Sequence, residues 1–174
     1  MAIKTVGVVG AGTMGSGIAQ ACASAGLRVI LRDIDQRYLD ASLTRMEQSM
    51  SRLVEKGKLT AQDRDSTLSR IQTTVELGEM AQAELIIEAA LEDPALKKNI
   101  FSELNNICPA ETVFASNTSS LSITDIASGS GRPDRFCGIH FFNPVSVMRL
   151  VEIISGLNTS ETTVEKAFEL VRAL

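Results

Sequence analysis

The residues of this chain with the clearest catalytic potential are its single histidine, His140, and Glu152, which lies twelve residues later. His140 falls in a strand-like run, residues 135–142, and Glu152 falls in the next one, residues 150–154. Two adjacent strands would bring the imidazole and the carboxylate together. A carboxylate on one ring nitrogen fixes the tautomer and stabilises the imidazolium, which leaves the other nitrogen as a base. Local sequence alone favours a simpler arrangement, with a hydrogen-bonded core histidine and a solvated glutamate.

A cluster of hydroxyl and amide side chains, residues 116–120, follows another strand-like run at 112–116. A serine hydroxyl at the carboxyl end of a strand can hold a substrate oxygen. The same residue types also favour a turn, because Ser, Thr and Asn bond to nearby backbone groups. Taken in isolation, the turn is the better explanation of this cluster.

A glycine-rich segment, residues 4–33, indicates which ligand could bind near these side chains. Apolar residues run into Gly10, Gly12 and Gly15, a helix-like run follows, and a second β-rich run ends at Asp33. This is the dinucleotide-binding pattern, in which the glycines allow a sharp turn, a close approach to the pyrophosphate and tight packing of helix on sheet. The helix N-terminus, at Thr13 and Met14, points free N–H groups at the phosphates.

Asp33 lies 18 residues after Gly15, where a carboxylate can bond to the adenosine ribose hydroxyls. A 2′-phosphate would meet like charge there, so the segment predicts NAD rather than NADP. Arg32 is adjacent, but strand alternation turns its side chain the other way. The missing Gly-Lys-Ser/Thr excludes a P-loop, and Met14 occupies the position where a methyltransferase-type GxGxG would have glycine.

A helical hairpin is expected after Asp33. Apolar residues recur every three or four positions over residues 36–58, with Arg45, Ser49 and Lys56 on the opposite, polar face. Thr60 and Asp63 resemble a capping box that opens a second helix over residues 61–69. The hairpin is either an extended connection or an arm leaning over the ligand site.

Strands and helices alternate along the rest of the chain. We expect strands at 71–75, 84–90, 112–116, 135–142 and 150–154, and helices at 95–107, 123–127 and 159–174. Asp93 and Pro94 are the expected N-cap and first residue of the helix at 95–107. The pattern predicts a Rossmann-like, doubly wound α/β fold with a mostly parallel sheet and the hairpin inserted after the second strand.

Composition limits the other possibilities. The 174 residues favour one domain, with 44% apolar and 22% charged residues as in ordinary globular proteins. A net charge of −4 argues against nucleic-acid binding and gives no basic handle for a membrane. Cys22, Cys108 and Cys137 are widely spaced, which indicates reduced thiols in a cytoplasmic protein, and one histidine cannot form a His-rich metal site. No run is long enough to span a membrane, and no secretory signal is expected.

Four motifs, VGVVGAGTMGSGIAQ, IIEAALED, SNTSSLSIT and HFFNPVSVMRLVEII, occur in the order and at the spacing of the L-3-hydroxyacyl-CoA dehydrogenases. The chain resembles their N-terminal NAD-binding domain, and is especially similar to the 3-hydroxybutyryl-CoA enzymes. The resemblance implies roles by position: His140 as general base, Glu152 as its charge partner, Ser119 near the substrate's 3-oxygen, Asn143 near nicotinamide and substrate, Glu92 and Lys97 as cofactor contacts, and Ser49 and Lys56 as contacts to coenzyme A.

The resemblance further implies a reaction and partners. The expected reaction interconverts a (3S)-3-hydroxyacyl-CoA, of short chain, and the 3-oxoacyl-CoA, with NAD as cofactor and no metal. Family members continue into a helical C-terminal domain that dimerises, so we expect residues 1–174 to be the cofactor domain of a homodimer and to turn over poorly alone. Two alternatives stay open: a non-catalytic sensor of NAD(H) or acyl-CoA, and a sister dehydrogenase of another 3-hydroxy acid.

Overall fold

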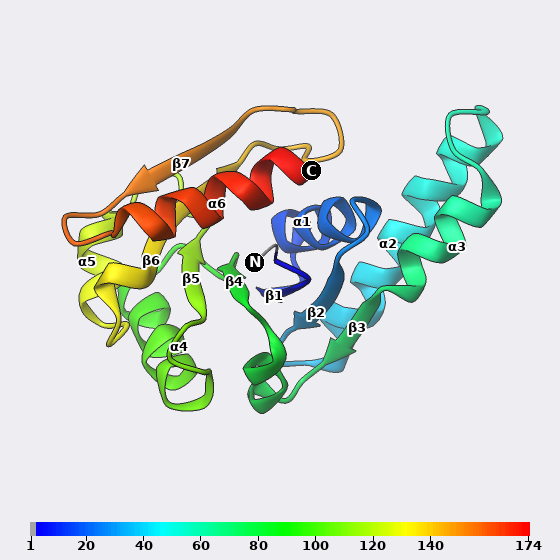
Figure 1. The fold of residues 1–174 in the computed structure, drawn as a ribbon. Helices are drawn as coiled ribbons and strands as arrows, with labels where there is room; N and C mark the ends of the chain where they lie inside the picture. Colours follow the sequence, from blue (N-terminus) through cyan, green and yellow to red (C-terminus); the bar gives the residue numbers. More distant parts are fainter. Residues whose placement is uncertain (1–2) are drawn as a thin grey trace.

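The computed structural model describes residues 3–174, which contain one seven-stranded sheet in the order β3-β2-β1-β4-β5-β6-β7 (Figure 1). Neighbouring strands are parallel except β6 and β7, which pair antiparallel. The predicted doubly wound, mostly parallel α/β fold is therefore confirmed. The strands are β1 (Thr5–Val9), β2 (Arg28–Arg32), β3 (Ile71–Thr74), β4 (Leu85–Glu88), β5 (Val113–Ser116), β6 (Phe136–Phe141) and β7 (Val151–Ser155).

Helices cover both faces of the sheet, and each face has its own apolar core. One core joins the sheet to α1 (Thr13–Ser24), α2 (Gln36–Glu55) and α6 (Glu161–Ala173). The other joins it to the 3₁₀ helix η1 (Leu77–Gln82), α4 (Pro94–Ile107) and α5 (Ile123–Ser128). Side chains alternate between the two cores along β4, since Leu85 and Ile87 lie in the first and Ile86 in the second. The remaining helices are α3 (Ala61–Ser69) and the 3₁₀ helix η2 (Pro133–Arg135).

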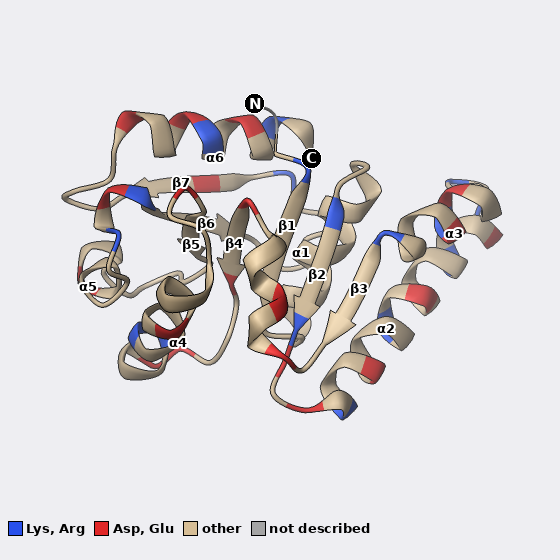
Figure 2. Cartoon of the chain, turned by 60° about the horizontal axis from the view of Figure 1, so that its bottom comes forward, with Lys and Arg blue, Asp and Glu red and all other residues tan. Residues whose placement is uncertain are grey.

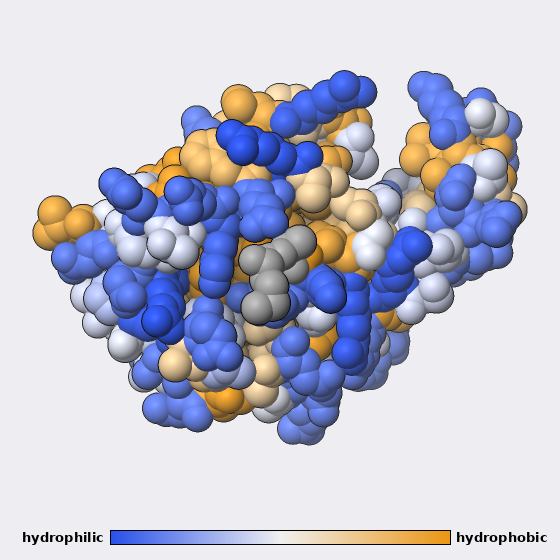
Figure 3. All heavy atoms as spheres, viewed as in Figure 1, coloured by the Kyte–Doolittle hydropathy of each residue, from blue (hydrophilic) through white to orange (hydrophobic). Residues whose placement is uncertain are grey.

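The predicted helical hairpin is formed by α2 and α3. Leu39, Met46 and Met50 are buried on one face of α2, as the apolar spacing predicts. Thr60 accepts a hydrogen bond from the Asp63 amide, 3.0 Å, so the predicted cap of α3 is confirmed. Figure 3 shows the tip of the hairpin standing apart from the body, with an open hollow between them.

Some details differ from the expectations. No helix was expected between the third and fourth strands, where η1 lies, or before the sixth, where η2 lies, because short 3₁₀ turns leave no 3.6-residue pattern. β4 ends at Glu88 instead of residue 90. The reason is local: the Glu88 carboxylate accepts a hydrogen bond from the Ala90 amide, 2.6 Å, which turns the chain out of the sheet.

Charged residues of both signs are interspersed over the outer helices. Figure 2 shows Lys and Arg alternating with Asp and Glu along α2, α3 and α6, so none of these helices presents a continuous basic face. In the part of the chain that the structure describes, no helix combines the length and apolarity needed to cross a bilayer.

Candidate active site

A pocket of about 300 Å³ opens at the carboxyl ends of the central strands. Segments that follow β1, β4, β5 and β6 all contribute to its walls, as expected for a ligand site in an open α/β sheet. Six of the residues singled out in the sequence line it: Met14, Glu92, Lys97, Ser119, His140 and Asn143.

The predicted pairing of His140 with Glu152 is confirmed. The two residues are opposite each other in the antiparallel β6–β7 pair, so their side chains leave the sheet on the same side. His140 Nδ1 lies 2.9 Å from Glu152 Oε2, and the Phe142 ring packs 4.5 Å from the imidazole centroid. Because Nδ1 is occupied by the carboxylate, Nε2 is the nitrogen left for a ligand.

The turn after β5 is tied to the strand that carries His140. Asn117 Oδ1 accepts a hydrogen bond, 2.8 Å, from the Phe141 amide. Within the turn, Thr118 Oγ1 accepts from the Leu121 amide at 3.1 Å, which leaves Ser119 exposed at the pocket. Both explanations of this polar cluster therefore hold: it is a hydrogen-bonded turn, and the turn presents a serine hydroxyl to the site.

Asn117 is a site residue that the sequence analysis did not assign. Its amide side chain fixes the Ser119 turn relative to His140, although the two segments are far apart in the chain. The available signal was weak, because asparagine at the start of a polar turn is explained equally well by local backbone bonding.

The glycine turn fits a dinucleotide. Gly10 has φ +105°, and a Cβ there would lie 2.6 Å from the Ala89 carbonyl oxygen, so the turn needs glycine. A Cβ at Gly12 would meet no atom within 4 Å, which leaves the backbone open to a ligand. Asp33 Oδ2 accepts from the Ala11 amide at 2.6 Å, so the carboxylate stands beside the turn as predicted.

The first turn of α1 is the part of this site suited to phosphate. Its N-cap, Gly12, provides no side-chain hydrogen bond. The other α-helices of the described chain are all capped, by Asp35, Thr60, Asp93, Ser122 and Ser160. The partial positive charge at the start of α1 is therefore available to an anionic group.

Arg45 lies on the exposed, polar face of α2, as expected, and it also reaches the glycine turn. Its Nη2 donates to the Ala11 carbonyl at 2.8 Å and to Ser16 Oγ at 3.0 Å. The reason is tertiary: α2 packs across α1, where Ser42 Oγ also lies 2.7 Å from Ser16 Oγ. Arg45 thus adds a cation to the glycine turn that helical periodicity alone did not predict.

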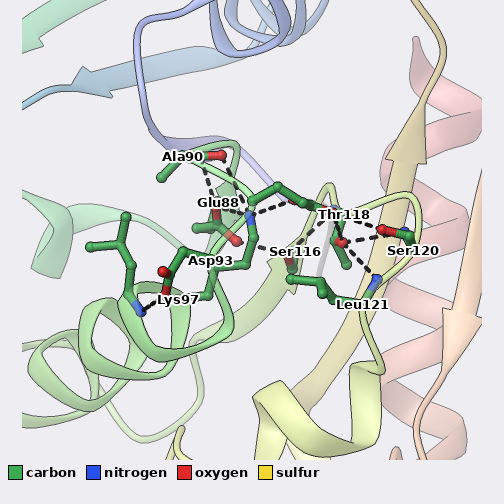
Figure 4. Close-up of polar contacts among 10 residues, drawn as sticks. Glu88, Ala90, Asp93, Lys97, Ser116, Thr118, Ser120 and Leu121 are labelled. Carbon is green, nitrogen blue, oxygen red and sulfur yellow. Dashed lines mark hydrogen bonds and ion pairs between the residues drawn. The ribbon is translucent and has the colours of Figure 1, made fainter.

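A buried charge cluster forms one wall of the pocket (Figure 4). The Lys97 ammonium, only 1% exposed, lies 2.6 Å from Glu88 Oε1 and 3.3 Å from Glu92 Oε2. Glu88 is fully buried, and its other oxygen accepts from Ser116 Oγ at 2.7 Å. The cluster was missed because Glu88 falls inside an otherwise apolar strand; that isolated charge was the signal available in the sequence.

Glu92 is the partly exposed member of this cluster. Burial raises the pKa of its carboxyl, but the Thr118 hydroxyl and the Lys97 ammonium outweigh that effect, and the pKa lies below its ordinary value. The carboxylate is therefore ionised at neutral pH, so Glu92 and Lys97 present one carboxylate and one ammonium to the pocket, with Glu88 buried behind them.

Ser49 and Lys56 do not line this pocket. Ser49 is half-buried in α2, and Lys56 is exposed at the C-terminal end of that helix. The structure therefore keeps the two predicted coenzyme A contacts on the hairpin, apart from His140 and Glu152.

The cysteines are not placed for chemistry. All three are buried and unpaired, and desolvation raises the pKa of Cys22 and of Cys137 to about 12. Both thiols therefore stay protonated and unreactive. Residues 3–174 contain no group of three His, Cys, Asp or Glu side chains arranged as metal ligands.

Comparison with known proteins gives one consistent family. The profile of the family described as "3-hydroxyacyl-CoA dehydrogenase, NAD binding domain" matches residues 5–174. The chain is 44% identical to a 3-hydroxybutyryl-CoA dehydrogenase of Clostridioides difficile, over 96% of this chain and 59% of that protein. It is equally identical, 44%, to a 3-hydroxyadipyl-CoA dehydrogenase of Escherichia coli, over 97% of this chain and 35% of that protein.

A solved structure agrees with these matches. The (S)-3-hydroxybutyryl-CoA dehydrogenase from Ralstonia eutropha superposes with a TM-score of 0.97 at 45% identity, covering 99% of this chain and 61% of that one. The chain thus spans about three fifths of the length of two of these relatives and about a third of the other.

Proposed function

The chain belongs to the 3-hydroxyacyl-CoA dehydrogenase family, as its NAD-binding domain, and we propose that the protein carrying it interconverts (3S)-3-hydroxyacyl-CoA and 3-oxoacyl-CoA. Short-chain substrates are favoured, since relatives of similar identity carry the names 3-hydroxybutyryl-CoA and 3-hydroxyadipyl-CoA dehydrogenase. The observation that carries the proposal is the His140–Glu152 pair, whose imidazole lines the same pocket as Met14 of the glycine turn.

The cofactor is held by backbone and one carboxylate. The amides at the start of α1 bind the pyrophosphate, and Asp33 bonds to the adenosine ribose, as its place beside the Ala11 amide supports. Bound NAD would supply the acceptor for the hydride that leaves C3 of the hydroxyacyl group. Glu92 and Lys97 face the same pocket and contact the cofactor there.

His140 moves the proton. Its Nε2 takes the proton from the 3-hydroxyl during oxidation and returns it during reduction, while Glu152 at Nδ1 stabilises the imidazolium. Ser119 and Asn143, which line the pocket together with the histidine, hold the 3-oxygen and orient the acyl group. Holding the substrate in the reactive orientation contributes much of the rate enhancement, because the reacting groups no longer have to meet by random collision.

Coenzyme A extends from the pocket toward the hairpin. Lys56 offers an ammonium to a phosphate and Ser49 offers a hydroxyl, and the hollow beside the hairpin leaves room for a nucleotide-sized group (Figure 3). The full-length enzyme is a cytoplasmic homodimer that pairs through a helical C-terminal domain. Residues 1–174 alone bind NADH but turn over poorly.

The test is substrate preference of the purified full-length protein. We expect oxidation of NADH with acetoacetyl-CoA at a kcat/KM at least ~10²-fold above that with free acetoacetate, because the coenzyme A handle contributes binding energy to the reacting centre. A preference for free acetoacetate would favour a sister dehydrogenase of a 3-hydroxy acid. NADH binding without turnover of any 3-oxoacyl-CoA from four to ten carbons would favour a sensor and refute the proposal.

A further inference from the structure

Gly17 lies inside a helix, and its backbone conformation does not require glycine. It lies in the second turn of α1, and its φ is negative, since the positive-φ glycines of the described chain are Gly10, Gly26, Gly57 and Gly131. Helix propensity favours alanine over glycine at such a position. The contact that explains it is with Val145: a Cβ at residue 17 would lie 2.9 Å from both Cβ and Cγ2 of that side chain.

Val145 belongs to the loop that follows β6, residues 143–150. Seven of these eight residues are exposed, and Val145 alone is half-buried, packed against the core under α1. The loop's two backbone hydrogen bonds run from the Val147 and Met148 amides to the Pro144 carbonyl, so both are internal. Val145 is therefore the residue that anchors this loop to the rest of the domain.

The loop and α1 meet at the pocket. Met14 and Gly17 are three residues apart, so they share one face of the helix. Met14 lines the pocket together with Asn143, which is two residues before Val145 in the chain. The depth at which Val145 sits on Gly17 thus fixes the distance between the cofactor helix and the asparagine.

We propose that Gly17 is a positioning residue: by leaving space for Val145, it holds the loop of residues 143–150 close to α1 and places Asn143 for reaction. This rests on the proposed function for its effect on turnover, but the packing itself does not. The Val145 Cβ is one bond from the backbone and cannot rotate away from an added methyl group. Since ordinary contacts begin near 3.4 Å, the loop must move outward.

The primary test is Gly17→Ala in the full-length protein, with Gly78→Ala as matched control. Gly78 lies in η1, and a Cβ there meets nothing within 4 Å. We expect Gly17→Ala to lower kcat/KM for acetoacetyl-CoA ~10- to 100-fold, because small misplacements of orienting groups cost this much. The Kd for NADH, measured by nicotinamide fluorescence without substrate, should change less than about twofold, and the melting temperature should stay close to wild type.

A double-mutant cycle separates the contact from a general effect of the methyl group. Val145→Gly removes the anchor and should by itself lower kcat/KM. In the Gly17→Ala/Val145→Gly variant, alanine should have no additional effect, because nothing remains for it to displace. Independent, multiplying losses would overturn the proposal, as would activity within twofold of wild type in either folded single variant. If Gly17→Ala fails to fold, the kcat/KM of Val145→Gly still tests the proposal.

Hydrogen–deuterium exchange of the cofactor-free protein makes the test independent of turnover. Peptides covering residues 143–150 should exchange faster in Gly17→Ala and in Val145→Gly, and peptides covering β1 should be unchanged. Unaltered exchange at 143–150 would overturn the packing argument. A wild-type protein with no activity would instead refute the proposed function and leave this result standing.

Discussion

Two pairs of side chains, one buried beside the pocket and one at its mouth, are similar in the distance between their polar atoms and differ in exposure. Lys97 Nζ and Glu88 Oε1 are 2.6 Å apart with side chains 1% and 0% exposed. His140 Nδ1 and Glu152 Oε2 are 2.9 Å apart, with side chains 16% and 52% exposed. The first pair ties the end of β4 to α4, and the second spans the antiparallel pair at the edge of the sheet.

The difference in exposure indicates different roles: the buried Lys97–Glu88 pair stabilises the structure, and the more exposed His140–Glu152 pair is available for proton transfer. Glu88 accepts hydrogen bonds from Lys97, Ala90 and Ser116, so its charge is compensated inside the protein and has no reason to change. His140 has one nitrogen satisfied and the other facing the pocket, so it can take up and release a proton.

The largest effect should come from removing the base. His140→Gln in the full-length protein keeps a polar side chain but cannot accept a proton, so we expect kcat to fall ~10³-fold, within the range for general acid–base groups. The Kd for NADH should change little, because Asp33 and the glycine turn are untouched. Stopped-flow absorbance at 340 nm with acetoacetyl-CoA measures the first quantity, and NADH fluorescence titration measures the second.

Glu152→Gln serves as the graded control for this variant. It leaves the imidazole in place and removes only the charge behind it, so its loss should be smaller than that of His140→Gln. Equal activity of His140→Gln and wild type would show that the histidine is not the base, and would return the pair to a structural role.

Breaking the buried Lys97–Glu88 pair should lower the stability of the fold. Lys97→Met leaves the Glu88 carboxylate buried without its cation, which costs about 3–5 kcal/mol of the free energy of unfolding. Lys98→Met is the matched control, because Lys98 Nζ lies 2.7 Å from Asp125 Oδ1 with side chains 33% and 55% exposed, and such pairs contribute about 1 kcal/mol or less. Urea denaturation followed by circular dichroism compares the two; equal losses would contradict the assignment.

Much of the architecture on which this comparison rests follows from sequence patterns. The capping box of Thr60 and Asp63 places α3 at its observed bounds, and the fingerprint correctly places Asp33 beside the glycine turn. These features are local, or depend on one strand–turn–helix unit, so nearby residues determine them. The adjacency of His140 and Glu152 was one of two interpretations, because consecutive strands commonly pair. Local sequence favoured the other, a core histidine and a solvated glutamate, and the register of β6 and β7 decides for the pair.

The buried pair was not predictable in the same way. Ser116 reaches Glu88 only when β4 and β5 are neighbours, and Lys97 reaches it only when the first turns of α4 pack at the end of β4. Neither the strand order nor that packing can be deduced from local sequence patterns. Arg45 reaches Ala11 only through the angle at which α2 crosses α1. In both cases tertiary packing determines the partner of a polar side chain. The residue type alone does not reveal that partner.

The smallest effect should come from Glu92, which is intermediate between the two pairs. Its side chain is 42% exposed, yet it bonds to Thr118 and Lys97, and its carboxyl pKa is lowered in the folded protein. A lowered folded-state pKa means that its stabilising effect is complete above the unfolded value of about 4.3 and is lost as the pH falls through the folded value. Glu92→Gln should therefore reduce the melting temperature slightly at pH 7, by the equivalent of less than about 1 kcal/mol, because solvent screens a half-exposed group.

The same variant should lose part of the acid sensitivity of the wild type. Below pH 4 the melting temperatures of the two proteins should converge, since the wild-type carboxyl is then increasingly protonated. Glu169→Gln, at an exposed position of α6, is the control and should run parallel to wild type. Convergence would show that Glu92 stabilises the fold through its charge, which the Thr118 hydroxyl and the Lys97 ammonium bind. A constant difference across the pH range would mean that Glu92 acts through packing alone.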